Sequence, residues 1–585
     1  MRLDAPILSN ILAATGYSPK VGILTTPQKK NSNLQQLARR TIAVKLLREL
    51  TRRQHELGWL SDDTLREIAK QQRVPLYRLE GLVSFYPSFR RTPPPRKTVH
   101  VCRDVSCAMG GCAKLNADLR GKFAGQEDVE IVEVSCIGRC EVAPAVSINE
   151  IPIGNASLDN LLPLIDGSQP LPNNDPTQTP RKWKCDPYLK PKDRYNTVRS
   201  LGAGSSESGT ETLGRSCIDA LKASGLRGMG GAGFPTGRKW ELVRGEKSET
   251  KYVICNADES EPGTFKDRVI LEELPHLVIE GMLLAGLTIG AESGIVYLRH
   301  EYQKEQKALE AALKHAHETG ILGDNASGTG RRFDIEIFVS PGGYILGEET
   351  ALLEALEDKR GEPRNKPPYP GTHGLWSKPT LINNVETYAF TTFIMSRGAD
   401  RWIDQAPGDY VGLKFVSVSG DVKQPGVYEI PIGTTVAELI ELAGGMRDGV
   451  TLQAFLPGGA SSNFLPADKV HTPLDFDAMK AAGSMLGTGA VIVIGDQHDL
   501  FELATNIVRF FRNESCGKCV PCRVGSQKAV QILESVACGQ SESSELTILP
   551  ELGDTLEQTS ICGLGQVALN PILSLMKNVP EAVPQ

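Results

Sequence analysis

Most of the 13 cysteines fall into two sets that have the short spacing of metal ligands. In the C-terminal set, Cys516, Cys519 and Cys522 form a C-x2-C-x2-C run, and Cys562 follows farther along the chain. Three cysteines at this spacing with a distant fourth are typical of a [4Fe–4S] cluster, and zinc is the less favoured alternative. The pattern predicts that these four thiolates hold a [4Fe–4S] cluster.

The N-terminal set consists of two pairs, Cys102 with Cys107 at C-x4-C and Cys136 with Cys140 at C-x3-C. Zinc sites more often use C-x2-C pairs, so the spacing favours a [2Fe–2S] cluster, and zinc stays the alternative. No histidine falls between the clustered cysteines of either set. The other cysteines singled out are expected only to pack: Cys112, Cys185, Cys217 and Cys538.

A glycine-rich stretch suits a third kind of chemistry, the binding of a phosphate. Six glycines lie from Gly225 to Gly237, and glycine lets the backbone approach a ligand closely and aim N–H groups at an anion. Lys239 adds a positive charge, and Asn256, Asp258 and Glu259 offer acceptors for a ribityl chain or a ribose. Neither the P-loop spacing nor the usual dinucleotide fingerprint applies. A flexible surface loop is the alternative.

The predicted strands lead into these residues. Strands over 98–102 and 129–134 each end at a cysteine pair, so four thiolates can converge on one cluster. Strands over 252–255, 294–298 and 333–339 alternate with helices over 271–287 and 302–317. This alternation indicates a mostly parallel α/β sheet that binds ligands at the carboxyl ends of its strands.

The remaining elements divide the chain further. Residues 414–432 alternate as strands around two glycines and precede a capped helix over 434–444, which suggests a β-grasp domain. Helices over 500–512 and 527–537 flank the C-terminal cysteines. The predicted fold is multidomain α/β, with these parts: a flexible arm over 1–30, a helical bundle over 31–96, a [2Fe–2S] domain over 97–166, a linker over 167–200, a ligand-binding α/β domain over 201–410, a β-grasp domain over 411–495 and a [4Fe–4S] helical bundle over 496–585.

Composition limits the classes of partner. The formal net charge of −6 over 585 residues gives no basic surface for nucleic acid. No apolar run reaches the length of a membrane-spanning helix, and the N-terminus does not resemble a secretory signal. We therefore expect a cytoplasmic protein without direct membrane insertion, in which clustered cysteines bind metal and do not form disulfides.

From about Gly225 to its end, the chain resembles the FMN- and NADH-binding subunit of respiratory complex I and its soluble relatives, the diaphorase subunits of NAD-linked hydrogenases and formate dehydrogenases. The N-terminal quarter is similar to the thioredoxin-like [2Fe–2S] subunit that accompanies this flavoprotein. The resemblance thus implies a thioredoxin-like [2Fe–2S] domain over 97–166 and an FMN/NADH-binding α/β domain over 201–410. The resemblance implies FMN contacts from Gly228, Gly230, Lys239, Asn256, Asp258, Glu259, Tyr344, Gly347, Glu348, Asn383 and Asn384. It implies NADH contacts from Phe234, Glu261, Glu349, Lys366 and Tyr369.

Two positions depart from the family pattern: Leu346 stands where cysteine is common, and Tyr369 where phenylalanine is common. Both keep apolar bulk, so we expect tuning of the site and not its loss. The resemblance implies no catalytic acid or base on the protein, because the flavin itself carries out hydride transfer.

The fusion of the [2Fe–2S] domain to the flavoprotein resembles most the β subunit of NAD-dependent molybdenum or tungsten formate dehydrogenases. The implied cofactors are FMN, NAD(H), one [2Fe–2S] and one [4Fe–4S] cluster, and the implied partner is a catalytic α subunit with molybdenum or tungsten and further clusters. The alternatives are the diaphorase subunit of an NAD-reducing hydrogenase, a fused complex I-type flavoprotein, and an iron–sulfur adaptor without flavin.

Overall fold

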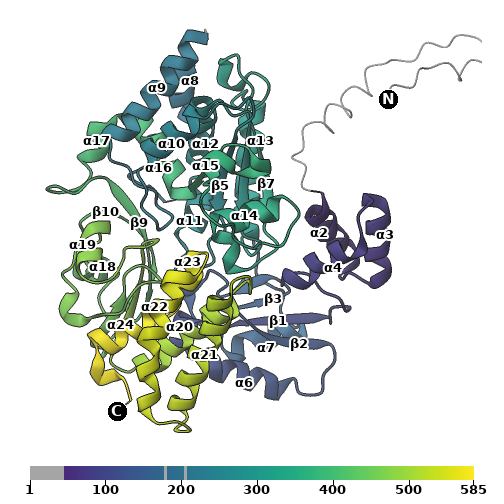
Figure 1. Cartoon of the computed structure of the whole chain (residues 1–585), viewed down its shortest axis with the longest axis vertical. Coiled ribbons are helices and arrows are strands. Elements are labelled where there is room, and N and C mark those ends of the chain that lie inside the picture. Colours follow the sequence, from purple (N-terminus) through teal and green to yellow (C-terminus); the bar gives the residue numbers. More distant parts are fainter. Residues whose placement is uncertain (1–44, 177–180, 203–206, 585) are drawn as a thin grey trace, which may run out of the picture. The chain divides into compact units, whose positions relative to one another are not determined.

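The computed structural model describes residues 45–176, 181–202 and 207–584 (Figure 1). The arm predicted over 1–30 and the first part of the predicted bundle, 31–44, lie outside the described residues. Within the described ranges, no helix combines the length and apolar character needed to cross a membrane.

Three short helices form the N-terminal bundle: α2 (Leu46–Leu57), α3 (Asp62–Gln72) and α4 (Leu76–Phe85). Ser61 caps α3 as the sequence predicts, because its side chain accepts a hydrogen bond from Thr64 N. The first N–H groups of α2 are capped from a distant segment, since Leu46 N and Leu47 N both donate to Asp358 Oδ1 (3.0 and 2.9 Å). Asp358 therefore joins this bundle to the predicted FMN/NADH-binding domain, which is called the flavin domain below.

The next sheet has the strand order β2-β1-β3-β4. The strands are β1 (Lys97–Cys102), β2 (Val129–Val134), β3 (Val146–Ile148) and β4 (Ile151–Ile153). The helices of this domain are α5 (Val105–Met109), α6 (Cys112–Lys122) and α7 (Leu158–Asp166). Both strands predicted here are confirmed. Because β1 and β2 are parallel, with Cys102 opposite Val134, the two cysteine pairs begin at one edge of the sheet.

The segment predicted as an extended linker over 167–200 is packed for much of its described length. Tyr195 and Val198 are buried, as is Cys185. Lys184 N and Cys185 N both donate to the Glu429 carboxylate (2.5 and 2.7 Å). The segment continues into α8 (Asn196–Gly202) and α9 (Glu207–Ala223). Its proline-rich composition suggested a spacer, whereas its few apolar side chains anchor it to the domains it connects.

The flavin domain has a fully parallel sheet with the order β7-β6-β5-β8. The strands are β5 (Tyr252–Ala257), β6 (Ser293–Leu298), β7 (Asp334–Val339) and β8 (Thr380–Asn384). The surrounding helices include α10 (Thr236–Gly245), α11 (Lys266–Glu273), α12 (Pro275–Ile289), α13 (Gln303–Glu318), α14 (Glu349–Leu356) and α16 (Val385–Arg397). The helix predicted over 271–287 is two helices, because Pro275 starts a new one at its first position.

A mixed sheet of order β10-β9-β13-β11-β12 follows. It contains β9 (Leu413–Gly420), β10 (Gly426–Pro431), β11 (Leu452–Leu456), β12 (Leu465–Pro466) and β13 (Ala490–Gly495), with helices α18 (Val436–Leu442) and α19 (Phe476–Ala481). Thr435 and Glu438 form a capping box at the start of α18. The predicted strand–turn–strand–helix order is confirmed here.

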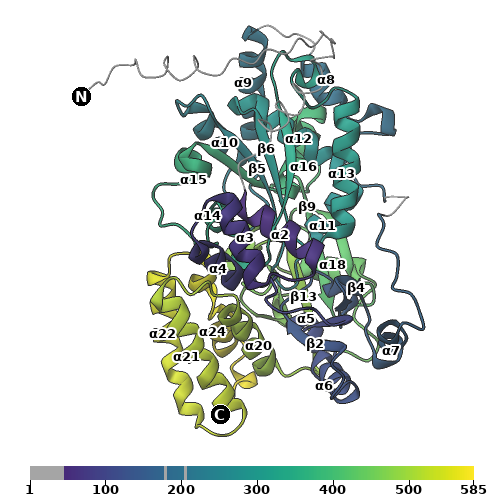
Figure 2. The same ribbon diagram turned by 90° about the vertical axis from the view of Figure 1, so that its right-hand side faces the viewer.

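The chain ends in a group of helices that pack on one another (Figures 1 and 2). They are α20 (Leu500–Asn513), α21 (Val520–Ala537), α22 (Leu549–Thr559), α23 (Gly563–Val567) and α24 (Asn570–Asn578). Helix α21 starts inside the cysteine run and not at residue 527 as predicted. Cys538 is exposed, so the expectation that it packs is wrong; Cys112, Cys185 and Cys217 are buried as expected.

Candidate functional site

The predicted flavin residues come together at the carboxyl ends of β5 and β8. These strands are neighbours, and Asn256 lies opposite Asn384. Asn256 Nδ2 donates to Gly347 O (2.8 Å) in η4 (Tyr344–Gly347), so the loop after β7 reaches the same edge. A Cβ added at Gly230 would lie 3.1 Å from Asn384 Cβ, which places the glycine-rich loop against the end of β8. Four separate segments therefore meet at one site.

The backbone of the glycine-rich loop fits an anion. Gly228 N donates to Phe234 O (2.9 Å) and Met229 N to Thr387 Oγ1 (3.0 Å). In contrast, the N–H groups of Gly230 to Gly233 make no backbone hydrogen bond among the described residues. Gly231 and Gly233 have φ of 114° and 61°, which only glycine adopts readily. Successive free N–H groups in such a turn are a binding arrangement for phosphate, and residues 228–233 are called the cradle below.

Lys239 and Asn383 form one side of this region. Lys239 Nζ donates to Ile382 O (3.1 Å), and burial lowers the pKa of the lysine, although Glu349 acts in the opposite direction. With its amide turned to satisfy both neighbours, Asn383 donates to Ile382 O (3.0 Å) and accepts from Trp240 Nε1 (2.8 Å). A bound anion would favour the charged form of Lys239 and so use this buried charge.

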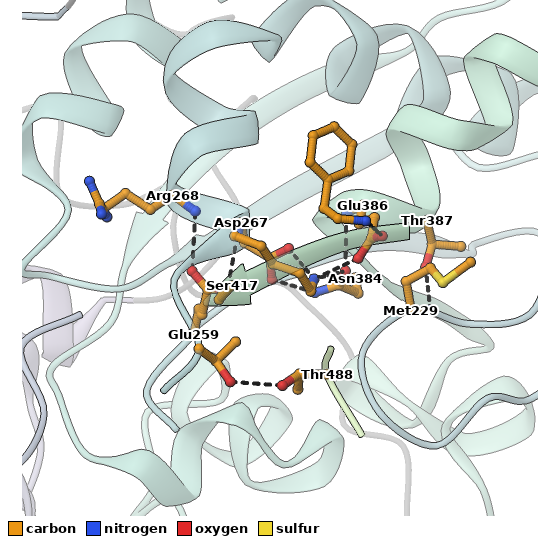
Figure 3. Close-up of polar contacts among 12 residues, drawn as sticks. Met229, Glu259, Asp267, Arg268, Asn384, Glu386, Thr387, Ser417 and Thr488 are labelled. Atoms are coloured by element: carbon orange, nitrogen blue, oxygen red, sulfur yellow. Dashed lines mark hydrogen bonds and ion pairs between the residues drawn. The ribbon is translucent and has the colours of Figure 1, made fainter. Parts of the chain in front are cut away.

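Three carboxyl groups in the loop after β5 are buried, and burial is the largest cause of their raised pKa values. The pKa is about 6 for Asp258 and about 7 for both Glu259 and Glu261. Asp258 accepts from Ser260 Oγ and Ser340 Oγ (2.9 and 3.1 Å). Glu259 caps α11 by accepting from Asp267 N and Arg268 N (2.9 and 3.1 Å; Figure 3). Much of their hydrogen-bonding capacity therefore holds the protein loops in place.

The residues implied for NADH comprise two exposed aromatic rings, a lysine paired with carboxylates, and Glu261, which has separate partners. Phe234 and Tyr369 are 41% and 60% exposed, as rings available to stack on a ligand would be. Lys366 Nζ contacts Glu348 Oε1 and Glu349 Oε1 (2.9 and 3.1 Å). Glu261 is separate from these, because its Oε1 accepts from Ser461 N and Ser461 Oγ (2.8 and 2.5 Å) in the loop after β11. The 456–463 loop thus contacts the flavin domain.

Tyr344, which the resemblance implies as an FMN contact, and Leu346, which departs from the family pattern, both lie in η4. Tyr344 packs against Phe510 and Phe511 of α20, with ring centroids 5.0 and 6.3 Å away. Leu346, where the family commonly has cysteine, is fully buried. The packing of η4 on α20 places the loop after β7 against the C-terminal group of helices, which contains the C-terminal cysteines.

The four N-terminal thiols lie together and buried. Cys136 Sγ and Cys140 Sγ are 3.4 Å apart, and the neighbouring thiols of Cys107 and Cys136 raise the pKa of Cys102. Backbone N–H groups donate to these sulfurs: Ala145 N to Cys107 and Gly263 N to Cys140 (both 3.4 Å), and Gly138 N to Cys136 (3.3 Å). Since Gly263 belongs to the loop after β5, the flavin domain directly contacts a predicted cluster ligand.

The C-terminal set is assembled by α21 and α23. Ser515 Oγ lies 3.2 Å from Cys522 Sγ. A Cβ added at Gly565 would lie 2.9 Å from Cys522 Cβ, so α23, which Cys562 precedes, packs closely on α21. Burial raises the pKa of Cys562 to about 12. In the described residues no group of three or more His, Cys, Asp or Glu side chains is arranged to hold a single metal ion, so the ligand sets rest on spacing and on the domain families below.

Glu514, which was not predicted from the sequence, contacts residues next to or within the predicted [2Fe–2S] and FMN sites. Glu514 Oε1 accepts from Ser135 Oγ (2.5 Å), next to Cys136, and Glu514 Oε2 accepts from Tyr344 N (2.8 Å) in η4. Glu514 itself stands two residues before Cys516. Its position beside the cysteine run was the one available signal, but nothing in the sequence indicated its distant partners.

A buried group of charges around Asn384 was also not predicted from the sequence. Lys266, Asp267, Glu386 and Lys414 contact one another there, and Figure 3 shows Asp267, Asn384 and Glu386 close together. Lys266 and Asp267 begin α11, whereas Lys414 comes from β9.

Four domain families match the chain. They are the thioredoxin-like [2Fe-2S] ferredoxin family over residues 33–169, the Nuo51 FMN-binding domain over 221–391, the SLBB domain over 415–462 and the NADH-ubiquinone oxidoreductase-F iron-sulfur binding region over 502–585. The predicted multidomain fold and its FMN, [2Fe–2S] and [4Fe–4S] cofactors are thereby confirmed, and the zinc alternatives are not supported.

Individual relatives agree with these families. The F 2 subunit of the NADH-quinone oxidoreductase of Rhizobium meliloti is 44% identical over 362 residues, 62% of this chain and 86% of the relative. The HndC subunit of the NADP-reducing hydrogenase of Solidesulfovibrio fructosivorans is 41% identical over 360 residues, 61% of this chain and 73% of the relative.

Among solved structures, a chain of the NAD+-reducing [NiFe]-hydrogenase in its air-oxidised state matches with a TM-score of 0.80 and 32% identity. The match covers 91% of this chain and 92% of the other, so it extends beyond the flavin domain. This chain belongs to the family of NADH-oxidising flavoprotein subunits that includes the F subunit of NADH-quinone oxidoreductase, and it carries FMN-binding, [2Fe–2S] and [4Fe–4S] regions on one polypeptide.

Proposed function

We propose that this chain is the β subunit of a cytoplasmic NAD-dependent formate dehydrogenase, which exchanges electrons between NAD(H) and a molybdenum- or tungsten-containing α subunit. The observation that carries the proposal is the complete set of Cys102, Cys107, Cys136 and Cys140 in a domain fused to the flavoprotein. In the hydrogenase branch the fused domain can lack this set. The stretches 456–462 and 560–571 also resemble the formate branch.

The site residues then have defined roles. FMN, when bound, supplies the conversion between a two-electron hydride and single electrons. The N–H groups of Gly230 to Gly233 and the ammonium of Lys239 hold its phosphate. Asn256 and Asn383 order the loops at the ribityl side, and Phe234 and Tyr369 stack on the rings of the dinucleotide. No side chain has to transfer a proton to the reacting carbon.

A second candidate is the diaphorase subunit of an NAD-reducing hydrogenase. The match to the NAD+-reducing [NiFe]-hydrogenase chain, which covers nine-tenths of both chains, favours it. HndC, a relative with a hydrogenase name, favours it as well. In both candidates this chain is the NAD(H)-linked module of a larger complex, and only the catalytic partner differs.

The test is to purify the chain anaerobically together with the proteins that bind it. Formate and hydrogen are added separately, and flavin bleaching and reduced-cluster signals are followed by visible and electron paramagnetic resonance spectroscopy. Reduction by formate that requires a molybdenum- or tungsten-bearing partner supports the proposal. Reduction by hydrogen alone overturns it in favour of the hydrogenase module.

A further inference from the structure

Two lysines and two carboxylates form a buried ion cluster beside the flavin site, defined here as Lys266, Asp267, Glu386 and Lys414. The side chains of Lys266, Glu386 and Lys414 are 0% exposed, and that of Asp267 is 4% exposed. Buried charges are unfavourable unless each is paired. Two positive and two negative groups give the cluster no net charge, so the loss of one member leaves an uncompensated charge.

Each ion in the cluster contacts an opposite one. Glu386 Oε2 lies 2.6 Å from Lys414 Nζ and 2.9 Å from Lys266 Nζ, and Lys266 Nζ also lies 2.6 Å from Asp267 Oδ1. Glu386 therefore bridges the two lysines. Lys414 has no carboxylate partner other than Glu386 among the described residues, and burial lowers its pKa to about 8.

The cluster fixes the side chain of Asn384 on both sides of its amide. Asn384 Oδ1 accepts from Lys266 Nζ (3.2 Å) and Glu386 N (3.0 Å), and Asn384 Nδ2 donates to Asp267 Oδ2 (2.5 Å; Figure 3). Asn384 Cβ is the atom on which Gly230 of the phosphate cradle packs. The position of the cradle thus depends on an asparagine that the ion cluster holds.

The cluster also joins the SLBB domain to the flavin domain. Lys414 is on β9, where its Nζ donates to Phe415 O (2.9 Å) and where Phe415 N donates to Glu386 Oε1 (2.8 Å). Farther along the same strand, Ser417 Oγ accepts from Phe265 N (3.0 Å), immediately before α11. The strand β9 therefore holds both α11 and the start of α16, the two elements that carry the remaining ions.

We propose that Lys414 and Glu386 are positioning residues for FMN: they balance the charges of Lys266 and Asp267, and so hold Asn384 and the cradle in place from the SLBB domain. The inference rests on placing the flavin between the cradle and Asn384. It makes the SLBB domain a determinant of flavin affinity and potential, although Lys414 itself touches no flavin.

The test compares Lys414→Met, Glu386→Gln and the double variant. Each is made in the complete protein with its iron–sulfur clusters in place, and FMN is then removed. The dissociation constant of FMN is measured by quenching of flavin fluorescence, and the flavin midpoint potential by spectroelectrochemistry. Each single variant should weaken FMN binding about tenfold. Lys414→Met leaves a negative cluster and should lower the potential. Glu386→Gln removes the carboxylate that helps keep Lys414 charged, so at a pH below the pKa of Lys414 it leaves a positive cluster and should raise the potential. The double variant, again neutral, should return close to the parent in potential.

Opposite shifts with recovery are a signature of charge, which a purely structural role would not produce. Lys423→Met, in an exposed ion pair of the same domain with Asp448, is the matched control and should leave both quantities unchanged. Shifts of the same sign in both single variants, or an unchanged dissociation constant and potential despite lower thermal stability, would overturn the proposal.

A separate variant distinguishes failure of the flavin placement from failure of this inference. Lys239→Ala should weaken FMN binding if the cradle holds the phosphate. If Lys239→Ala binds FMN normally, the flavin placement is wrong and the inference falls with it. If Lys239→Ala loses FMN while Lys414→Met and Glu386→Gln of the ion cluster retain it, the inference alone is wrong. Neither result depends on whether the partner oxidises formate or hydrogen.

Discussion

The two predicted cluster sites differ in how far they are enclosed. All four cysteines of the N-terminal set are buried, and backbone N–H groups donate to three of the sulfurs. In the C-terminal set, Cys516 and Cys519 are partly exposed, and Val520 and Val524 beside them are exposed. Hydrogen bonds to sulfur and solvent exposure both influence cluster potential. We therefore expect the C-terminal cluster to be the more accessible of the two, while the N-terminal cluster is enclosed by this chain.

The largest effect should follow the loss of a cysteine ligand from the more accessible [4Fe–4S] cluster. Cys516→Ser should abolish electron delivery to the partner, because the [4Fe–4S] cluster loses one of its predicted ligands. Reduction of the flavin by NADH should remain. The check is NADH-driven reduction of the partner together with iron content, and Cys538→Ser, an exposed cysteine outside both sets, serves as the control. Equal losses in the two variants would contradict this assignment.

Glu261, a buried carboxyl group that interacts with Cys136 of the enclosed N-terminal site, should make the stability of the protein depend on pH. Burial raises the pKa of Glu261 from 4.5 to about 7, so the folded state holds this proton more tightly than the unfolded state does. Its contribution to stability is therefore present below about pH 4.5 and is lost as the pH rises through about 7, a change of about 3 kcal/mol.

Glu261→Gln should remove that dependence while its amide oxygen still accepts from Ser461. Urea unfolding of the two proteins between pH 5.5 and 8, followed by cluster absorbance, measures the difference. Parallel pH profiles for parent and variant would show that Glu261 does not titrate in this way.

A pair of glycines compares the crowding of the two sites directly. Gly263 donates to Cys140 and has φ of 93°, and a Cβ there would lie 2.8 Å from Ile492 Cδ1. Gly517, beside Cys516, has a similar φ of 76°, but its Cβ would meet nothing closer than 3.8 Å. Both alanine variants strain the backbone, and Gly263→Ala should cost about 2 kcal/mol more through overpacking. Similar unfolding midpoints for the two would refute the difference in packing.

The smallest expected effect concerns the contact between the two sites. Ser135→Ala removes the hydroxyl that donates to Glu514 and should destabilise the protein by about 1 kcal/mol, since a hydrogen bond to a charged group is lost. It should also perturb the spectrum of the adjacent [2Fe–2S] cluster and leave that of the [4Fe–4S] cluster unchanged. Ser168→Ala, at an exposed position after α7, is the control. An unchanged [2Fe–2S] spectrum would mean that Glu514 does not act on that site.

What the sequence predicted was local in origin. Cysteine spacing, the glycine run and the strands over 98–102 and 129–134 are properties of short segments, and each is present in the structure or matched by a domain family. Pro275 also carried a usable signal, because proline at the first helical position marks a new helix.

What it could not predict depends on distant contacts. Strand β8 reads Thr-Leu-Ile-Asn-Asn without alternation, because it is largely buried, and it becomes a strand by pairing with β5. Glu386 and Lys414 look like ordinary surface residues until the fold brings them together. All the direct flavin and NADH contacts remain predictions. For Asp258 and Glu259, the structure places their oxygens on neighbouring protein groups.

The central claim is that one chain connects NADH, through FMN, to an enclosed and an accessible cluster. It is tested most directly by anaerobic titration of the purified chain with NADH, with flavin absorbance and electron paramagnetic resonance recorded at each addition. The account predicts flavin bleaching together with separate signals from a [2Fe–2S] and a [4Fe–4S] cluster, and in Cys516→Ser the loss of the second signal alone. Flavin bleaching without either cluster signal, or loss of bleaching in Cys516→Ser, would contradict it.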